Sequence, residues 1–237
     1  MRRPWPLTPR FILPFIVALS GCAQPERLPD APTRPLLPED SYIEAARRGA
    51  AVYRIQTSAS RLLVRVGRAG PMKNLGHDHV IASEDIEGLV MLHDDPAASR
   101  ADLLVPLQRL VVDKAEYRAQ LGVEGEVSES AIDGTTSNMQ DKVLESAIYP
   151  WAQISARFAS AQSDPPTLSI SVTLHGTAFE YLVPVDLKVE PGRLVINGEM
   201  TLRHTDFGLT PFSAMGGLLR VAEELELQFS LVARPLD

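Results

Sequence analysis

The sequence of 237 residues has little cysteine, no apolar run of membrane-spanning length and no cluster of basic residues. Its one cysteine, Cys22, has no partner in the chain for a disulfide or a two-cysteine redox motif, so the fold must be held by its core alone. The apolar run from Phe11 to Leu19 contains Pro14 and is shorter than the about 20 residues that cross a bilayer as a helix. The net charge of −7, without a basic cluster, is a poor match for nucleic acid or for an anionic lipid surface. We therefore expect no nucleic-acid partner.

Motifs for chemistry are also missing. The sequence contains no recognisable nucleophile motif of a serine–histidine–aspartate set, no phosphate-binding loop and no paired catalytic carboxylates. We therefore expect a binding protein and not an enzyme, with no covalently held cofactor. The sequence does not indicate an oligomeric state.

The N-terminus has the features of a secretory signal, with three arginines before the apolar run and small residues after it. The segment Leu19-Ser20-Gly21-Cys22 resembles the lipobox of bacterial lipoproteins. That resemblance implies that residues 1–21 are a signal peptide that is removed, and that Cys22 carries a diacylglycerol as a membrane anchor. An ordinary signal peptide, or a short membrane anchor with an unrelated cysteine, is the alternative.

Removal of residues 1–21 would change the net charge from −7 to −10, because this segment carries three arginines and no acidic residue. Membrane association would then depend on the lipid at Cys22, and two or more chains anchor a protein stably where one does not. The lipobox implies a place in the bacterial cell envelope, on the periplasmic face. Ala23 stands where aspartate is the usual signal for inner-membrane retention, which favours the outer membrane over the inner.

Residues 22–49 are predicted to be a tether that follows the lipidated cysteine. Five prolines between residues 23 and 41 oppose helices and sheet ladders, and they favour an extended spacer of about 3.1 Å per residue. A proline-rich docking site is the alternative. A short helix is predicted at Tyr42–Arg48, before Gly49.

Residues 50–237 are predicted to be a mainly β domain, because apolar and polar residues alternate along most of this region. The clearest apolar rows are Leu168, Ile170, Val172 and Leu174; Phe179, Tyr181, Val183 and Val185; Ile196, Met200 and Leu202; and Leu225, Leu227 and Phe229. Eight or nine strands with short turns indicate an antiparallel barrel or a sandwich, and a barrel of about eight strands has room for one ligand. The helical excursion lies between residues 113 and 147, with one or two turns at Lys114–Leu121 and a longer helix at Ser137–Ala147.

Several short motifs occur in an order that resembles the YceI-like family, over about residues 50–234. They are Gly76-His77-Asp78-His79, Tyr149-Pro150, Leu174-His175-Gly176-Thr177 and Arg203-His204-Thr205-Asp206-Phe207-Gly208. The resemblance implies an antiparallel, lipocalin-like β-barrel whose apolar interior binds a polyisoprenoid lipid or an isoprenoid quinone. The four apolar rows are then the expected ligand-binding residues. Leu144–Pro150 departs from the Phe-Phe-Asp run that often precedes Tyr-Pro in the family, so we expect an altered lining there.

His77 and His79 allow three interpretations. Two imidazoles at positions i and i+2 of a strand point the same way and share a metal in some zinc and copper sites. The protein would then be a metal- or haem-associated redox accessory. The histidines could instead lie in a polar turn, or one imidazole could contact a quinone carbonyl. A further alternative to ligand binding is a structural lipoprotein whose barrel is filled by side chains.

Two features near the C-terminus complete the prediction. Residues 210–217 are predicted to be a loop, either the lip of a cavity or a plain connection. Glu223 shares strand parity with Leu225 and Leu227, and a regular strand would bury its carboxylate at a cost of several kcal/mol. We expect the strand to begin after Glu223; a bulge, or a pair with Arg220, is the alternative.

Overall fold

The structure is a computed structural model that describes residues 33–236. The predictions for the signal peptide and for Cys22 lie outside these residues. The described residues lie in one compact unit. None of the helices in the described part is both long enough and apolar enough to cross a bilayer.

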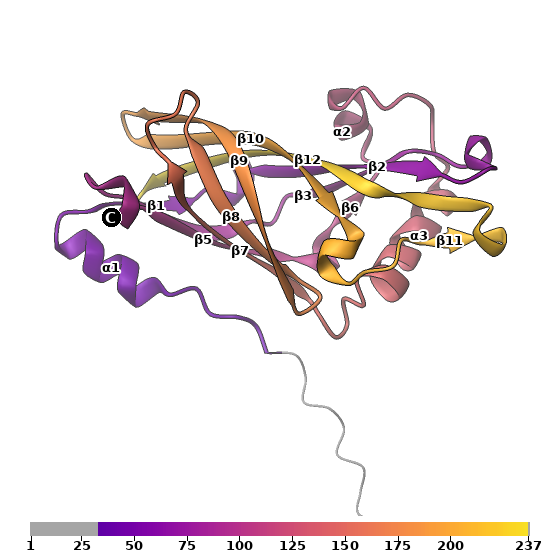
Figure 1. The fold of residues 1–237 in the computed structure, drawn as a ribbon, viewed down its shortest axis with the longest axis horizontal. Helices are drawn as coiled ribbons and strands as arrows, with labels where there is room; N and C mark the ends of the chain where they lie inside the picture. Colours follow the sequence, from indigo (N-terminus) through magenta and orange to yellow (C-terminus); the bar gives the residue numbers. More distant parts are fainter. Residues whose placement is uncertain (1–32, 237) are drawn as a thin grey trace, which may run out of the picture. The chain divides into compact units, whose positions relative to one another are not determined.

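Three helices and twelve strands, with several short helical turns, make up the described chain (Figure 1). In chain order the elements are α1 (Glu39–Arg47), β1 (Ala51–Ile55), η1 (Thr57–Ala59), β2 (Arg61–Ala69), η2 (Lys73–Leu75), β3 (His79–Ser83), β4 (Glu87–Leu92), η3 (Pro96–Ala98), β5 (Arg100–Pro106), η4 (Leu107–Arg109), β6 (Val111–Val112), α2 (Ala115–Gln120), α3 (Glu129–Asn138), the π-helical turn η5 (Met139–Val143), β7 (Trp151–Ser160), β8 (Thr167–Leu174), β9 (Thr177–Glu190), β10 (Arg193–Arg203), η6 (His204–Phe207), β11 (Ser213–Ala214), η7 (Met215–Gly217) and β12 (Leu219–Pro235).

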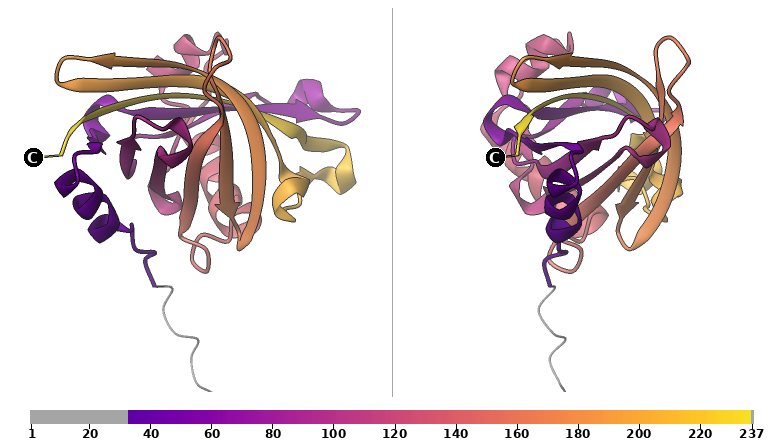
Figure 2. Two further views of the ribbon diagram at one scale, coloured as in Figure 1. Left: turned by 60° about the vertical axis from the view of Figure 1, so that its left-hand side comes forward. Right: turned by 90° about the vertical axis from the view of Figure 1, so that its left-hand side faces the viewer.

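The strands form an antiparallel barrel. Eight of them follow one another as neighbours in the order β1, β4, β5, β7, β8, β9, β10 and β12, and β12 pairs with β1 to close the ring. Figure 2 shows the strands curving around the interior, with α1 outside them. The prediction of a mainly β, lipocalin-like barrel with a helical excursion between strands is confirmed.

Three neighbouring strands of this ring are interrupted. Along the edge of β12, β1 pairs with one part and β2 with the next. In the following row of the wall, β4 pairs with β1 and β3 pairs with β2. In the row after that, β5 pairs with β4 and β6 pairs with β3. At the first interruption the hydroxyl of Ser60 donates to the Val232 carbonyl (3.2 Å) and accepts from the Val232 N–H (3.0 Å). A side chain thus replaces the backbone pairing that the interruption removes.

Beyond these interruptions the ring opens. Among the described strands, β6 makes no ladder with β7, and β9 pairs with β10 only between Val185 and Glu190. Segment 129–143 packs beside β6, where Gln140 Nε2 donates to the Leu107 carbonyl (2.8 Å). η6 packs against β9, β10 and β12. The barrel is therefore continuous at one end, and at the other its wall is completed by helical segments.

α1 lies on the outer surface of the barrel. Tyr42 and Ala45 pack with Val52, Leu89 and Met91, which are the outward residues of β1 and β4. The hydroxyl of Tyr42 also donates to Asp102 (2.7 Å). The helix predicted at Tyr42–Arg48 is present and begins three residues earlier, and it packs on the folded body although it falls within the expected tether.

The longer helix of the excursion differs from the prediction of Ser137–Ala147. α3 begins at Glu129, where the Ser128 hydroxyl accepts from the Ala131 N–H (3.4 Å), and helical structure ends at Val143. Met139, Val143 and Leu144, whose spacing suggested one face of a helix, do face the interior. The N-terminal turns carry weak helix formers, including Gly134, so their periodicity gave little signal. The shorter helix, α2, agrees with the prediction.

Candidate ligand-binding cavity

A cavity of about 360 Å³ lies inside the barrel. Its walls are mostly aliphatic and come from β2, β5, β7, β8, β10 and β12, with the excursion and η6 completing them. This volume is within the range of about 300–1,000 Å³ that is common for small-molecule sites. The interior is therefore not filled by side chains, contrary to the alternative of a solidly packed structural barrel.

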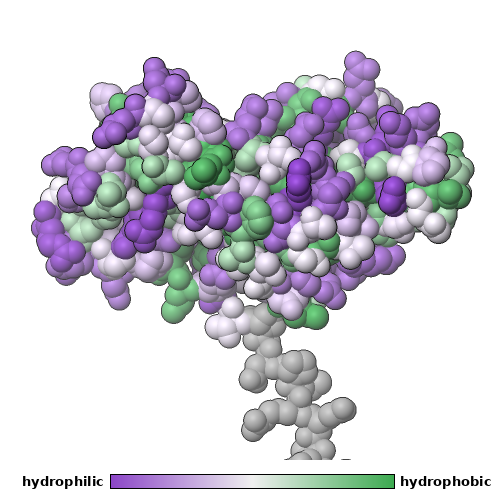
Figure 3. Space-filling view, in the orientation of Figure 1, coloured by the Kyte–Doolittle hydropathy of each residue, from purple (hydrophilic) through white to green (hydrophobic). Residues whose placement is uncertain are grey.

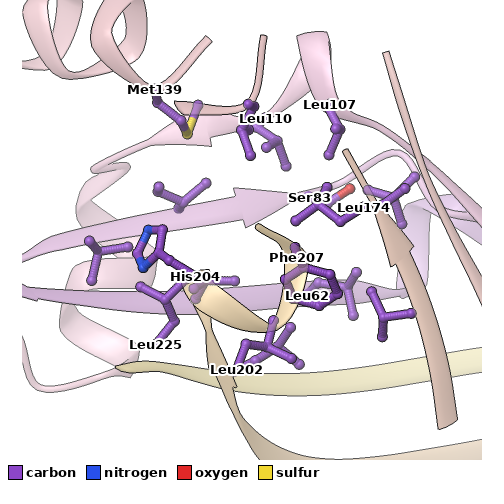
Figure 4. A pocket seen from close by; sticks show the side chains of 18 of the residues that line it. Leu62, Ser83, Leu107, Leu110, Met139, Leu174, Leu202, His204, Phe207 and Leu225 are labelled. Carbon is purple, nitrogen blue, oxygen red and sulfur yellow. The ribbon is translucent and has the colours of Figure 1, made fainter. Parts of the chain in front are cut away.

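Ten of the fourteen expected ligand-binding residues line the cavity. They are Leu168, Ile170, Val172, Leu174, Ile196, Met200, Leu202, Leu225, Leu227 and Phe229. Side chains from the connecting segments face them. Figure 4 shows Leu107, Leu110 and Met139 on one side of the cavity, opposite Leu202, Phe207 and Leu225.

Phe179, Tyr181, Val183 and Val185 of β9 do not line the cavity. Val183 and Val185 are buried in the core, whereas Phe179 is 41% exposed at the part of β9 that lacks pairing with β10. Phe207, buried at 1% exposure, packs against Tyr181 with ring centroids 6.4 Å apart. Phe207 lines the cavity itself. It therefore forms the part of the wall that we expected the apolar side chains of β9 to form.

A hydrogen bond holds η6 in this position. The hydroxyl of Tyr181 donates to Asp206 Oδ2 (2.7 Å), and Gly208 ends the turn in the left-handed region at φ 68°. Burial and the bond to Asp206 raise the pKa of Tyr181 above its ordinary value, so the hydroxyl keeps its proton as a donor. The segment Asp206-Phe207-Gly208 thus closes the wall between β9 and β10.

One end of the cavity is polar and basic. No aspartate or glutamate is found among the described residues that line it. The lining residues that are exposed to solvent are Arg68, His77, Arg203 and Arg220. We call these four residues the mouth of the cavity. Two of these cations pair with carboxylates that lie beside the mouth, Arg68 with Asp78 (3.3 Å) and Arg203 with Glu224 (2.8 Å).

His79 lies just inside the mouth on the inner face of β3, in phase with Ile81 and Ser83, which also line the cavity. Its Nδ1–H donates to Asp113 Oδ2 (2.6 Å), and its Nε2 lies 3.5 Å from the Thr135 hydroxyl. The imidazole is therefore held in one orientation, with Nδ1 occupied by the carboxylate and Nε2 directed toward α3.

Asp113 is the buried centre of this arrangement. Its side chain has no exposure and accepts from the Val80 N–H (2.9 Å) and from Arg118 Nη1 (2.6 Å) as well as from His79. Burial acts to raise the pKa of Asp113, but the hydrogen bonds from His79, Val80 and Arg118 outweigh it and hold the pKa below its ordinary value. Asp113 is thus a charged anchor beneath the mouth, and no pattern in the sequence indicated this role.

The histidine pair does not form part of a larger ligand set. The rings of His77 and His79 lie 6.5 Å apart, edge to face, and no group of three or more histidine, cysteine, aspartate or glutamate side chains in residues 33–236 is arranged to hold a metal ion. Asp78 instead pairs with Arg68 (3.3 Å) and Arg65 (3.7 Å). The metal interpretation therefore has two imidazoles and no third ligand in the described part of the chain.

The comparisons with known proteins agree with this architecture. None of the curated proteins matches the sequence. The structure of BcnA from Burkholderia cenocepacia is similar with a TM-score of 0.54 at 15% identity, covering 75% of this chain and 98% of BcnA. A polyisoprenoid binding domain from Saccharophagus degradans, implicated in plant cell wall breakdown, is similar with a TM-score of 0.52 at 14% identity, covering 78% of this chain and 99% of that domain. At these identities the likeness shows the fold. The model of the YceI-like domain matches residues 53–233, and the chain therefore belongs to the YceI-like domain family.

Proposed function

We propose that the protein is a binding protein that holds a polyisoprenoid lipid or an isoprenoid quinone in the barrel. The observation that carries this proposal is the division of the cavity into aliphatic walls and a mouth that carries arginine and histidine side chains. An isoprenoid chain has no hydrogen-bonding group, so its transfer from water into such walls is favourable. A quinone carbonyl or a phosphate oxygen accepts hydrogen bonds, and the mouth supplies donors.

His79 is a candidate for contact with the headgroup. Its ring is oriented by Asp113 and lines the cavity, next to Thr135. The polyisoprenoid binding domain from Saccharophagus degradans is structurally similar to this chain, and this similarity supports the same class of ligand here.

The cellular setting is also part of the proposal. Lipidation at Cys22 would tether the barrel to a membrane on the periplasmic side of the cell envelope, and Ala23 favours the outer membrane. A carrier held in this way stays close to a source of isoprenoid lipid. The described residues, 33–236, lie in one compact unit.

The test is lipid extraction and mass spectrometry of the protein lacking residues 1–22, which keeps this whole compact unit. Binding of added decylubiquinone and geranylgeraniol is measured on the same preparation. We expect recovery of an isoprenoid or saturable binding of at least one probe. Absence of both would refute the proposal.

A matched pair of variants locates the site. Ile170→Trp adds a large ring to a buried residue of the cavity wall, whereas Leu182→Trp adds it to a side chain of β9 that is 68% exposed. We expect Ile170→Trp to weaken probe binding at least tenfold and Leu182→Trp to leave it unchanged. Equal binding by both variants would show that the ligand lies outside the cavity.

A further inference from the structure

Two loops that are far apart in the sequence meet at the open end of the barrel. They are residues 70–78, between β2 and β3, and residues 211–220, which lead into β12 and include its first two residues; we call them together the tip. The Met72 N–H donates to the Leu218 carbonyl (2.9 Å), and a Cβ on Gly70 would lie only 2.5 Å from the same oxygen. Gly70, at φ 93°, thus allows the two loops to pack closely.

The tip exposes large apolar side chains. Leu75 is 64% exposed, Met215 58% and Leu218 43%. Figure 3 shows hydrophobic surface at the right-hand end of the molecule, where Figure 1 places the ends of β2 and β11. Such side chains, grouped on two loops that pack together, are typical of a surface that is covered by a partner.

The charge at the tip indicates which partner. The tip contains the exposed cations Lys73 and Arg220 and one carboxylate, Asp78. Asp78 is paired with Arg65 and Arg68. The chain as a whole carries a net charge of −7, so the tip has a local charge of the opposite sign.

We propose that the tip docks on the surface of an anionic lipid bilayer. Leucine and methionine side chains enter the boundary between headgroups and acyl chains, and the cations face the anionic headgroups. The negative charge elsewhere on the protein is repelled by the same surface, so docking orients the barrel with the tip toward the lipid.

The tip is also continuous with the cavity. Gly76, His77, Phe212, Leu219 and Arg220 belong to the tip or its edge and line the cavity. With the proposed function, docking would place the mouth against the bilayer, and a lipid could enter without crossing water. The net charge of the chain predicted weak adsorption to anionic lipid. The two loops change that expectation, because the fold brings their apolar and cationic side chains together on one surface.

The test is co-sedimentation of the protein lacking residues 1–22 with vesicles. One set contains phosphatidylglycerol and phosphatidylethanolamine, and the other contains phosphatidylcholine alone. We expect at least tenfold tighter binding to the anionic vesicles, reduced by salt. The triple variant Leu75→Ser, Met215→Ser, Leu218→Ser should lose at least tenfold, and Lys73→Glu about fivefold or more.

The matched control is Leu182→Ser with Val189→Ser, two exposed apolar side chains of β9 outside the tip. It should bind vesicles like the unaltered protein. Equal binding of both vesicle types, or a triple variant that binds like the control, would overturn the docking proposal.

Binding of decylubiquinone in buffer without vesicles separates the two proposals. The triple variant should keep this binding, because none of its three residues lines the cavity. Vesicle binding without any isoprenoid ligand would refute the proposed function and leave docking supported. Ligand binding without vesicle binding would refute docking and leave the proposed function supported.

Discussion

The buried pair of Asp113 and Arg118 gives the sharpest test of the structure beneath the mouth. Arg118 Nη1 donates to Asp113 Oδ1 (2.6 Å), with 8% of the arginine side chain exposed and none of the aspartate. Arg118 also donates to the carbonyls of Asp78 (2.8 Å), Glu124 (3.0 Å) and Gly125 (3.1 Å). It therefore joins β3 to the segment after α2 as well as neutralising the carboxylate.

Arg118→Met removes the cation and leaves a buried carboxylate with two of its three donors. We expect a loss of about 3–5 kcal/mol in the free energy of unfolding, the usual cost of breaking a buried pair from one side. Asp113→Asn keeps an acceptor for the Val80 N–H and tolerates the positive φ of 54°, so its cost should be about 1–3 kcal/mol. The double variant should lose less free energy of unfolding than the sum of the two single losses, by at least about 1 kcal/mol, because it leaves neither charge without its partner.

The assay is urea unfolding, monitored by circular dichroism. It compares the unaltered protein, the two single variants and the double variant, all lacking residues 1–22. The pKa of Asp113 is lowered in the folded state, so its ionisation stabilises the fold above the ordinary aspartate pKa of about 3.9, and this contribution is lost as the pH falls through the folded pKa. The gap between the unaltered protein and Asp113→Asn should therefore narrow in acid. A loss below about 1 kcal/mol for Arg118→Met, or additivity within about 0.5 kcal/mol, would refute the reasoning.

Three further predictions use other parts of the molecule. Gly198→Ala should destabilise the barrel by about 1–3 kcal/mol, because the added Cβ would lie 2.4 Å from the ring of Phe229 on β12. Gly134→Ala should stabilise the protein by about 0.5–1 kcal/mol, because the added Cβ on α3 meets open space. Urea unfolding measures both changes. The pKa of Glu223 is lowered, chiefly by the Thr205 N–H, so Glu223→Gln should be less stable at pH 7, and the difference should disappear as the pH falls through the folded pKa; a gap that persists in acid would contradict this. Cys22→Ser should move the protein from the membrane to the soluble fraction without changing its unfolding midpoint, and retention in the membrane would refute lipid tethering.

The barrel could be predicted because its signal is local. Along β8, Leu168, Ile170 and Val172 alternate with small polar residues, and this row faces the cavity as its period requires. A similar row on β9 was less informative. Period two shows which side chains share a face, but it does not show that Phe207 of a distant turn will cover part of that face.

The orientation of Glu223 depended on strand pairing and not on parity. β12 begins at Leu219, before Glu223, so the prediction that the strand begins after it was wrong. The register between β12 and β2 shifts between Val221 and Leu225, as the bulge alternative requires. Glu223 accepts from the N–H and hydroxyl of Thr205 (both 2.8 Å).

His79 shows the same limit at the candidate site. It is in phase with Ile81 and Ser83, a signal that was present in the sequence, but the start of β3 could not be located without its pairing to β2. Asp113 and Arg118 lie far along the chain from His79, and only the fold brings them beside it. A buried ionic network of this kind has no sequence period by which to find it.

The interruptions in the three neighbouring strands explain why the cavity and the tip lie at the same end of the barrel. A ring of about eight strands leaves an interior just wide enough for side chains or for one small ligand. Here β1, β4 and β5 keep the ring closed, while β2, β3 and β6 continue past it without a ladder from β6 to β7 among the described strands. The wall at this end is completed by α3, η5 and η6, and Thr135, Met139 and Phe207 of these segments line the cavity. The ends of β2 and β12 project beyond the closed ring and carry the tip. The interrupted end of the ring thus carries both the helical segments of the cavity wall and the surface through which we propose that a ligand is loaded.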